Sequence, residues 1–568
     1  MISKSVLPAI AMAVASGLAM AAPPSPAGMP EFVGTDAPFA SNAIYFVMTD
    51  RFVNGDPSND HRHQGGAHPT FDIPVPGAPK GQSANIGYLG GDFKGVLENA
   101  GYIHNMGFGA VWITPIVDNP DQAFTGGDPV YWGSKFTDRG KTGYHGYWGV
   151  NFYKVDEHLP SRNLDFAQFT AKMHAAGLKV VQDIVLNHGS PAFTMPVRQP
   201  QFGQIFDKSG KLIADEQNLP PWQLDPVRNP LHRFYHAYED LVQLSNNDDQ
   251  SPLVLNYMVG AYEQWIDEGS DAFRIDTISH MSTTFWKQFS ARIRASHPGF
   301  FMFGEAFDYS PDNIGKYTWA RNGGISLLDF PLQQAVKQVF EHPDSDFAAL
   351  QARLYLTNGP YANPYELVTF YDNHDMARLA ATDNGFIDAD NFLFTARGIP
   401  AIYYGSEIGF ERGMAEHQGN RNYFGQQRID DAPEEPDLPA PGAHRTAARA
   451  DPGAAARPDA ADPFRRPAGV VLSRLPEGQR APDRTGTAQQ GRPRRRLQHP
   501  RRPAVRPLAT RLRRQGHRGD CRRQPACQRR GARRAGLPAR CAGHPPRSRR
   551  RADPADGGAR APQPLIDR

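Results

Sequence analysis

Cysteine is nearly absent from this chain, and what there is lies at one end. Only three of the 568 residues are cysteines, namely Cys521, Cys527 and Cys541. The first 520 residues therefore have no thiol and can form no disulfide bond. Their stability must come from buried apolar side chains and from any metal ion that they bind.

Long hydrophobic runs are also missing, except for one at the start. Residues 1–21 carry a positive charge at Lys4, an apolar run from Val6 to Met20 and the small-residue motif Ala-Met-Ala. This run is too short to span a membrane and is typical of a secretory signal peptide. We therefore predict a secreted or periplasmic protein without a membrane partner.

The last quarter of the chain lacks several residue types. From Gln427 onward there is no Lys, Met or Asn, and no aromatic residue follows Phe464. Arginine accumulates here, so the net charge of +3 hides an acidic first part and a basic end. Such a segment cannot bury enough apolar surface to offset the entropy of ordering. We predict that residues 427–568 form a disordered tail rich in Arg, Pro and Ala.

Two other interpretations of this tail deserve comparison. An arginine-rich segment can bind nucleic acid, but the interleaved aromatic residues of a stacking surface are missing, so we predict no nucleic-acid partner. Translation in a wrong reading frame of GC-rich DNA would remove the codons for Lys, Asn, Met, Phe and Tyr together. Codons for residues 441–459, moved one nucleotide forward, can encode an amphipathic helix and a Thr-Pro-Ala-Leu turn. We prefer this interpretation and predict an out-of-frame product.

The first part of the chain alternates between strand and helix patterns. Helix-like periodicity, as in residues 252–269, separates apolar segments that are bounded by turn residues. Eight alternations predict an α/β fold, a (β/α)₈ TIM barrel formed by residues 40–188 and 251–426. The intervening residues 189–250 are too long for an ordinary connection and predict a small inserted domain. The eight predicted strands are residues 43–52, 109–116, 178–185, 270–277, 300–306, 325–330, 367–375 and 399–405.

Three carboxylates end three of these strands. They are Asp276 in DAFRIDTISH, Glu305 in FMFGEAFD and Asp375 in FYDNHDMAR. Strands of a parallel barrel deliver such groups to one rim, where they can converge on one sugar and break a glycosidic bond. With Asp183 and His188 in VVQDIVLNH, the pattern resembles the α-amylase family of glycoside hydrolases over about residues 40–425.

The resemblance assigns roles to the carboxylates. It implies that Asp276 is the nucleophile, that Glu305 is the acid/base, and that Asp375 binds sugar hydroxyls and helps to distort the ring. Arg274 stands two residues before Asp276, so both side chains lie on one face of the strand. A fixed cation at this place would keep the nucleophile ionised and oriented.

Histidine and aromatic side chains complete the implied sugar site. By resemblance, His188 and His374 hydrogen-bond the sugar in the cleavage subsite. YHGYW lies on the long excursion after the second strand and offers an aromatic surface for the apolar face of a glucose ring. Tyr147 is the expected stacking residue, His145 a polar neighbour and Trp148 a second wall.

Two calcium sites are predicted from the same resemblance. Calcium takes six to eight oxygen ligands, and VNGDPSND with GGDF gathers such oxygens in tight turns. A solvated turn rich in Asn and Asp is the alternative interpretation. The predicted ligands of the first site are Asn54, Asp56, Asn59, Asp60, Gly90 and Asp92.

The second calcium site departs from the family pattern. It would use Asn187, the backbone carbonyl of His280, which is also a predicted substrate-binding residue, and a carboxylate from the inserted domain. Gln243 occupies the place where relatives carry that aspartate, and Asp240 is the available substitute.

The reaction type is the last prediction from the sequence. Glucanotransferases carry an aromatic residue just before the Asp of this loop, whereas here Glu239 precedes Asp240 and Tyr238 lies one residue earlier. This order favours hydrolysis over cyclisation. With the predicted calcium sites, we predict a calcium-dependent, monomeric hydrolase that cleaves internal α-1,4 bonds of starch. A glucanotransferase, a non-catalytic binding protein on the same fold, and an inactive product lacking the family's C-terminal β-sandwich are the alternatives.

Overall fold

The computed structural model describes residues 34–432. The predicted signal peptide lies outside the described residues, as does nearly all of the predicted tail, for which the loss of the β-sandwich was predicted. Eight parallel strands form one sheet in the order β12-β11-β10-β5-β2-β1-β14-β13. A parallel bridge between Leu328 and Val368 joins the two ends of this sheet. The predicted (β/α)₈ barrel is therefore confirmed. Its strands are β1 (Ile44–Val47), β2 (Ala110–Ile113), β5 (Lys179–Ile184), β10 (Ala272–Ile275), β11 (Phe301–Gly304), β12 (Ser326–Leu327), β13 (Val368–Thr369) and β14 (Ile399–Tyr403).

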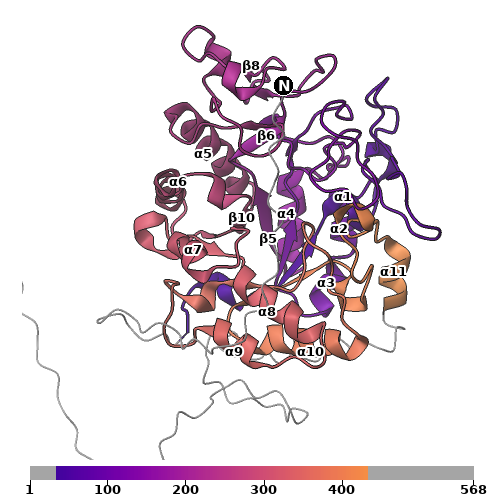
Figure 1. Cartoon of the computed structure of the whole chain (residues 1–568), viewed down its shortest axis with the longest axis vertical. Helices are drawn as coiled ribbons and strands as arrows, with labels where there is room; N and C mark the ends of the chain where they lie inside the picture. The colour runs from indigo at the N-terminus through magenta and orange to yellow at the C-terminus, as the bar shows by residue number, and fades with distance from the viewer. Residues whose placement is uncertain (1–33, 433–568) are drawn as a thin grey trace, which may run out of the picture. The chain divides into compact units, whose positions relative to one another are not determined.

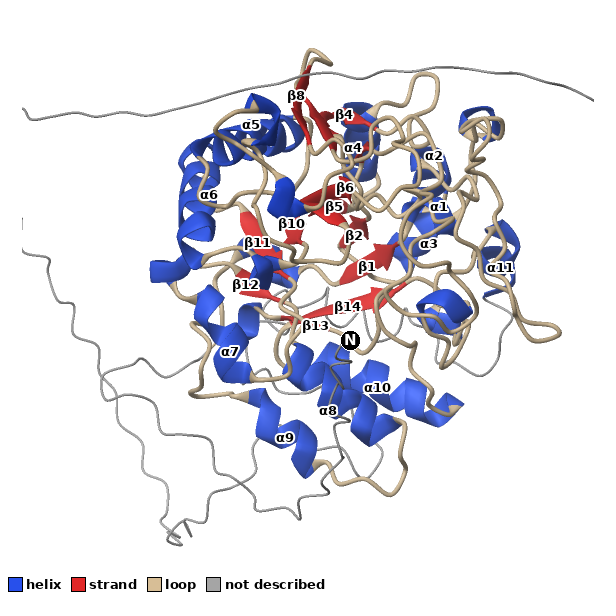
Figure 2. Ribbon diagram, turned by 45° about the horizontal axis from the view of Figure 1, so that its top comes forward, coloured by secondary structure: helices blue, strands red, loops and turns tan. Residues whose placement is uncertain are grey.

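Helices surround this sheet. Figure 2 shows the eight strands in the middle of the folded region and the helices arranged outside them. None of the helices within residues 34–432 is long and apolar enough to cross a membrane. The helices are α1 (Thr49–Phe52), α2 (Phe93–Glu98), α3 (Ala100–Asn105), α4 (Phe166–Ala175), α5 (Pro252–Asp267), α6 (Thr283–Ser296), α7 (Pro311–Gly315), α8 (Phe330–Phe340), α9 (Ala348–Leu354), α10 (Asp383–Thr395) and α11 (Gln426–Asp431).

The strands are shorter than the apolar segments that predicted them. Residues 43–52 were expected to form one strand, but β1 ends at Val47 and the next residues turn into α1. All four residues of α1 are buried, including Asp50 and Arg51. Apolar and buried segments therefore continue beyond the sheet into the rim loops, which is why hydrophobicity alone overestimates strand length.

Strand register brings the predicted site residues to one level. In the β10–β5 pair Arg274 lies opposite Asp183, and in the β10–β11 pair Ile275 lies opposite Gly304. Asp276 and Glu305 are the next residues along their strands, so they leave the barrel side by side at the carboxyl rim. This is the rim on which barrel enzymes build their sites.

Two long connections form small antiparallel structures above this rim. After β2, strands β3 (Val117–Asp118) and β4 (Asn151–Val155) pair with each other. After β5, the inserted segment pairs β6 (His188–Pro191) with β9 (Leu244–Asn246), and β7 (Gln204–Phe206) with β8 (Leu212–Asp215). Figure 1 shows β6 and β8 at the end of the barrel strands β5 and β10.

The fold continues a few residues past the predicted boundary at residue 427. Helix α11 buries Ile429. The side chains of Gln426 and Asn99 exchange hydrogen bonds of 2.9 and 3.0 Å. The first residues assigned to the tail therefore still pack against the barrel, because an apolar side chain and a side-chain amide pair hold them there.

Candidate active site

Arg274 occupies the centre of the site and contacts three carboxylates. Its side chain is fully buried, and its Nη1 lies 2.9 Å from Asp183 Oδ1 and 2.7 Å from Asp276 Oδ1. Its Nη2 lies 2.6 Å from Glu305 Oε2. One planar guanidinium therefore fixes the relative positions of Asp276 and Glu305, as expected of the residue that orients the nucleophile.

Asp183 is a structural anchor for this guanidinium. It is completely buried and accepts hydrogen bonds from Trp112 Nε1 at 3.0 Å and from the Tyr147 hydroxyl at 2.8 Å. Burial raises the pKa of Asp183 to about 7, although Arg274 lowers it. Asp183 belongs to the motif that indicated the family but was not among the predicted site residues. It supports the site through its contact with Arg274.

Glu305 has the environment of a general acid. Its side chain is 6% exposed, and its Oε1 is buried without a hydrogen-bond partner in the described residues. Burial raises the pKa of Glu305 well above its usual range, while Arg274 opposes the shift and Asp375 and Asp276 add to it. A raised pKa favours the protonated carboxylic acid, which is the form that can donate a proton.

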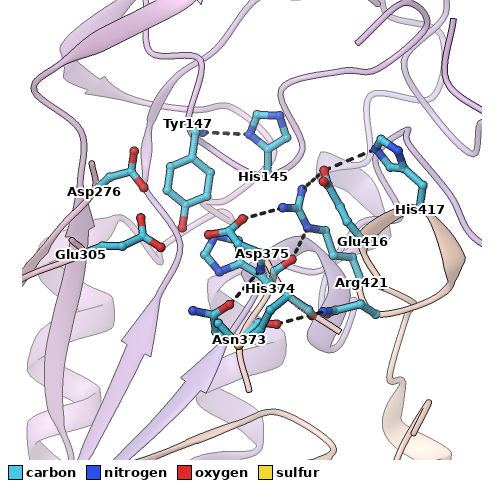
Figure 3. A network of polar contacts seen from close by, with 12 residues as sticks. His145, Tyr147, Asp276, Glu305, Asn373, His374, Asp375, Glu416, His417 and Arg421 are labelled. Atoms are coloured by element: carbon cyan, nitrogen blue, oxygen red, sulfur yellow. Dashed lines mark hydrogen bonds and ion pairs between the residues drawn. The ribbon is translucent and has the colours of Figure 1, made fainter. Parts of the chain in front are cut away.

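Asp375 lies across the site from Asp276 and Glu305, as Figure 3 shows. His374 Nε2 is 3.2 Å from Asp375 Oδ2, and Arg421 Nη2 is 2.9 Å from Asp375 Oδ1. The structure thus brings the three predicted carboxylates to one site, with Arg274 on one side and Arg421 on the other.

The predicted histidines are close to these carboxylates. His188 Nε2 lies 4.0 Å from Asp276 Oδ2. Burial lowers the pKa of His188 and lowers that of His374 and His145 well below the ordinary value. The three imidazoles are therefore neutral near pH 7, when each ring has one donor and one acceptor nitrogen for sugar hydroxyls.

The aromatic residues of YHGYW separate into two environments. The Tyr147 ring stacks on His374 with 5.2 Å between centroids, and its backbone N–H donates to His145 Nδ1 at 3.1 Å. Trp148 instead packs in a small apolar core with Phe124, Met195 and Phe202. Only 3% of Trp148 is exposed, so this residue supports the excursion, and its predicted role as a second aromatic wall stays a prediction.

Residues 46–435 match the catalytic domain of the alpha amylase family. The chain belongs to this family. Curated relatives include cyclomaltodextrin glucanotransferases from Niallia circulans, 33% identical over 389 residues, and from Bacillus sp. (strain 38-2), 32% identical over 388 residues. Each alignment covers 65% of this chain but 49% of the relative, so the chain spans about half the length of these proteins.

Solved structures of the α-amylase family agree with this assignment. A cyclomaltodextrin glucanotransferase with a three-domain ABC distribution is 30% identical, with a TM-score of 0.57, over 72% of this chain and 79% of that one. The α-amylase of Geobacillus thermoleovorans, complexed with acarbose, is 26% identical, with a TM-score of 0.53, over 73% and 80%.

The first predicted calcium loop folds as a compact turn. Asn54 Nδ2 donates to Asp60 Oδ1 at 2.7 Å, while Asn54 Oδ1 and Asn59 Oδ1 are buried without a partner in the described residues. A Cβ atom on Gly90 would approach Asn54 and Asp60 to 2.3 Å. Unpaired buried oxygens beside a position that only glycine fits are consistent with a cation site.

Besides Asp60, whose Oδ2 pairs with Arg62 at 2.7 Å, Asp56 and Asp92 are also engaged by groups of the protein. Asp92 caps helix α2 and accepts hydrogen bonds from the backbone N–H groups of Gly55, Asp56 and Gly95. It also accepts one from Asn59 Nδ2, which fills its four acceptor positions. Asp56 Oδ1 accepts from Ser58. A cation contact to Asp92 would have to displace one of these donors.

The second predicted calcium site gathers around Asp240. Asp240 Oδ2 is 3.1 Å from Asn187 Nδ2, and Asp240 Oδ1 is 2.9 Å from His280 Nδ1. Asn187 Oδ1 is buried and has no partner among residues 34–432. Gln243 turns away and donates to Asp138. The structure therefore places Asp240, rather than Gln243, beside Asn187.

The sequence interpretation missed three charged residues of this region. Arg421, Glu416 and Lys141 form ion pairs next to Asp375, with Arg421 Nη1 2.9 Å from Glu416 Oε1 and Lys141 Nζ 3.3 Å from the same atom. No periodic pattern marks them, because they lie on irregular loops after β14 and β2. Only folding brings these loops to Asp375.

Proposed function

We propose that this chain hydrolyses internal α-1,4-glucosidic bonds of starch and maltooligosaccharides with retention of configuration. The observation that carries the proposal is the shared guanidinium of Arg274, which contacts both Asp276 and the buried Glu305, whose pKa burial raises well above its usual range. A retaining glycosidase requires a nucleophilic carboxylate and a carboxylic acid close together at one sugar site, and the shared guanidinium holds two carboxyl groups in this arrangement.

The side chains can perform a double displacement. Asp276 attacks the anomeric carbon while Glu305 donates its proton to the departing glycosidic oxygen, which leaves a glycosyl ester on Asp276. Glu305, now ionised, takes a proton from water, and the resulting hydroxide oxygen displaces Asp276 from the anomeric carbon. Asp375, His374 and His188 hydrogen-bond the sugar hydroxyls, and Tyr147 contacts its ring.

Transfer to a sugar hydroxyl is the second candidate. The curated relatives named above are cyclomaltodextrin glucanotransferases, and Tyr238 on the inserted segment is 54% exposed, so an aromatic ring is available two residues before Asp240. The same covalent ester serves both reactions, and only the acceptor differs. Glu239 directly before Asp240 favours water as the acceptor.

The test is digestion of soluble starch by the full chain, followed by chromatography of the products. We expect linear maltooligosaccharides from the wild-type chain and none from Asp276→Asn, the control for contaminating amylase. Cyclic or disproportionated glucans would instead establish the transferase. A soluble, cooperatively melting chain without any turnover would overturn both candidates and support an inactive product.

We further propose that the chain binds calcium at the Asn54–Asp60 loop and at Asp240. Asn54, Asn59, Asp60 and the Gly90 backbone would hold the first ion, which would cross-link the loop and not take part in bond cleavage. A ligand that binds only the folded state stabilises it by about 2.7 kcal/mol at a concentration of 100 Kd.

Removal of calcium is expected to lower the melting temperature by several degrees, as measured by calorimetry with and without a chelator. Asn54→Ala should reduce this difference, whereas Asn256→Ala, on the exposed face of α5, should leave it unchanged. An identical melting temperature of the wild-type chain in calcium and in chelator would refute the calcium proposal.

Export and a monomeric state complete the proposal. The supporting feature is the leader pattern of residues 1–21, and starch is a polymer that is degraded outside the cytoplasm by exported enzymes. Fractionation of an expressing bacterial culture, with N-terminal sequencing of the exported product, tests the first part. Light scattering of the purified chain tests the second.

A further inference from the structure

Asp375 is held differently from the other two carboxylates of the site. Asp276 and Glu305 directly follow barrel strands, and their side chains are 7% and 6% exposed. Asp375 lies six residues beyond the end of β13, and its side chain is 30% exposed. The sheet therefore does not fix Asp375, and its position depends on the contacts that its loop makes.

Arg421 makes two of these contacts. Its Nη2 lies 2.9 Å from Asp375 Oδ1, and its Nε donates to the backbone carbonyl of His374 at 2.9 Å. The side chain of Arg421 is 8% exposed. One rigid guanidinium thus holds both the carboxylate and the peptide that precedes it, which fixes the direction of the Asp375 side chain.

Arg421 is in turn held by Glu416 and Tyr144. Its Nη1 lies 2.9 Å from Glu416 Oε1 and 3.3 Å from the Tyr144 hydroxyl. Lys141 Nζ contacts the same Glu416 oxygen at 3.3 Å and Asp138 Oδ1 at 2.9 Å. Figure 3 shows Arg421 between Asp375 and Glu416, on the side of the site away from Asp276.

The contacts extend to the inserted segment. Asp138 accepts a hydrogen bond from Gln243, which lies between β8 and β9. An aspartate at position 243 could not donate this bond and would face Asp138 as a like charge. A continuous series of polar contacts therefore connects Gln243, through Asp138, Lys141, Glu416 and Arg421, with Asp375.

We propose that Arg421 is the positioning residue for Asp375, and that Glu416 and Lys141 hold Arg421 in place. The inference rests on the proposed function, because it concerns how Asp375 is presented to the sugar. Arg421 does not act on the reacting atoms. It keeps Asp375 ionised and aimed at sugar hydroxyls, which strengthen their hydrogen bonds as the ring distorts toward the transition state.

The charged groups around Asp375 predict the direction in which its pKa changes when Arg421 is lost. The pKa of Asp375 is raised by burial and by Glu416, and it is lowered by Arg421 and by Arg274. His374 also faces Asp375 but is neutral. Loss of Arg421 removes the first of the lowering contributions, so Asp375 would become ionised only at a higher pH.

The experiment compares Arg421→Gln and Arg421→Lys with the wild-type chain on maltoheptaose across pH. We expect Arg421→Gln to lower kcat/KM by about 10- to 100-fold, the range for one charge-assisted hydrogen bond, with most of the loss in kcat. The acidic limb of its pH profile should move to higher pH. Arg421→Lys keeps the charge but not both contacts and should lie between the two.

Arg397→Lys is the matched control, because Arg397 is also buried, pairs with Asp329 at 2.6 Å and lies outside the site. This control should lower the melting temperature without moving the acidic limb of the pH profile.

If Arg421→Gln does not fold, kcat and the pH profile of Arg421→Lys and Glu416→Gln test the proposal instead. An active wild-type chain with an unmoved limb and unchanged kcat in the Arg421 variants refutes this inference alone. An inactive wild-type chain refutes it together with the proposed function.

Discussion

Replacement of Glu305 by glutamine is expected to lower kcat on maltooligosaccharides by about 10²–10⁴-fold, the usual contribution of a general acid. Glutamine keeps the size and the polar contacts of the side chain but has no proton to give to the leaving oxygen. The loss should be smaller on an aryl α-maltoside whose leaving group needs no proton. Steady-state rates on the two substrates provide the measurement.

The same variant has a predicted effect on the pH profile. Burial raises the pKa of Glu305 well above its usual range, so the acid keeps its proton to a higher pH than an ordinary glutamate does. Wild-type activity should therefore fall as the pH rises through that elevated pKa. The alkaline limb should be absent from the residual activity of Glu305→Gln, because the titrating group is gone.

Glu98→Gln is the control for this substitution. Glu98 lies at the end of α2, and its side chain is 55% exposed in a 3.8 Å contact with Lys94. Its removal should leave both the rate and the pH profile unchanged. Equal rates for Glu305→Gln and the wild-type chain would remove Glu305 from the role of acid.

Replacement of Arg274 by glutamine is expected to destabilise the chain by about 3–5 kcal/mol, the cost of leaving buried charges without their partner. The substitution leaves Asp183, Asp276 and Glu305 without their shared guanidinium. Domains are stable by only about 5–15 kcal/mol, so this loss is a large share of the total. Urea unfolding followed by circular dichroism measures it.

The destabilisation should depend on pH in a defined direction. Without Arg274, the pKa values of Asp183 and Glu305 in the folded state rise further above their values in the unfolded chain. Stability from groups with raised pKa is present below about pH 4, the unfolded pKa, and is lost as the pH rises through the folded pKa. With Arg274 present that value is already about 7 for Asp183. The difference from the wild type should therefore grow as the pH rises above about 7, where Asp183 ionises in the folded wild-type chain but not yet in the variant.

Arg274→Lys and Arg292→Gln are the comparisons. Lysine keeps one positive charge and should recover part of the lost stability, without the planar geometry that reaches three carboxylates. Arg292 lies exposed on α6, where it hydrogen-bonds Asn256, and its removal should change stability by less than about 0.5 kcal/mol. Equal losses for Arg274→Gln and Arg292→Gln would contradict the central role of the buried guanidinium.

The sequence alone located the barrel and the carboxylates at the ends of its strands. Each predicted strand contains an observed strand, because buried parallel strands form apolar segments that local patterns detect. Asp276 and Glu305 each directly follow the last residue of a strand. The alternation of side chains along β10 also placed Arg274 and Asp276 on one face, which their 2.7 Å contact confirms.

Tertiary structure decided the features that depend on loops. Trp148 is an aromatic residue in a sugar-binding motif, but folding buries it against the excursion and the inserted segment. The choice of Asp240 over Gln243 beside Asn187 depends on how the inserted segment turns, which no local pattern predicts.

One physical reason separates the features that the sequence determined from those that tertiary structure decided. Side chains on strands inherit their positions from hydrogen-bonded register and a two-residue period, so Asp276 and Glu305 were determined by the sequence. Arg421 lies on irregular backbone far along the chain, and its contact with Asp375 exists only because the loops after β13 and β14 meet at one rim. Contacts between loops follow no sequence periodicity, so the folded chain alone determines them.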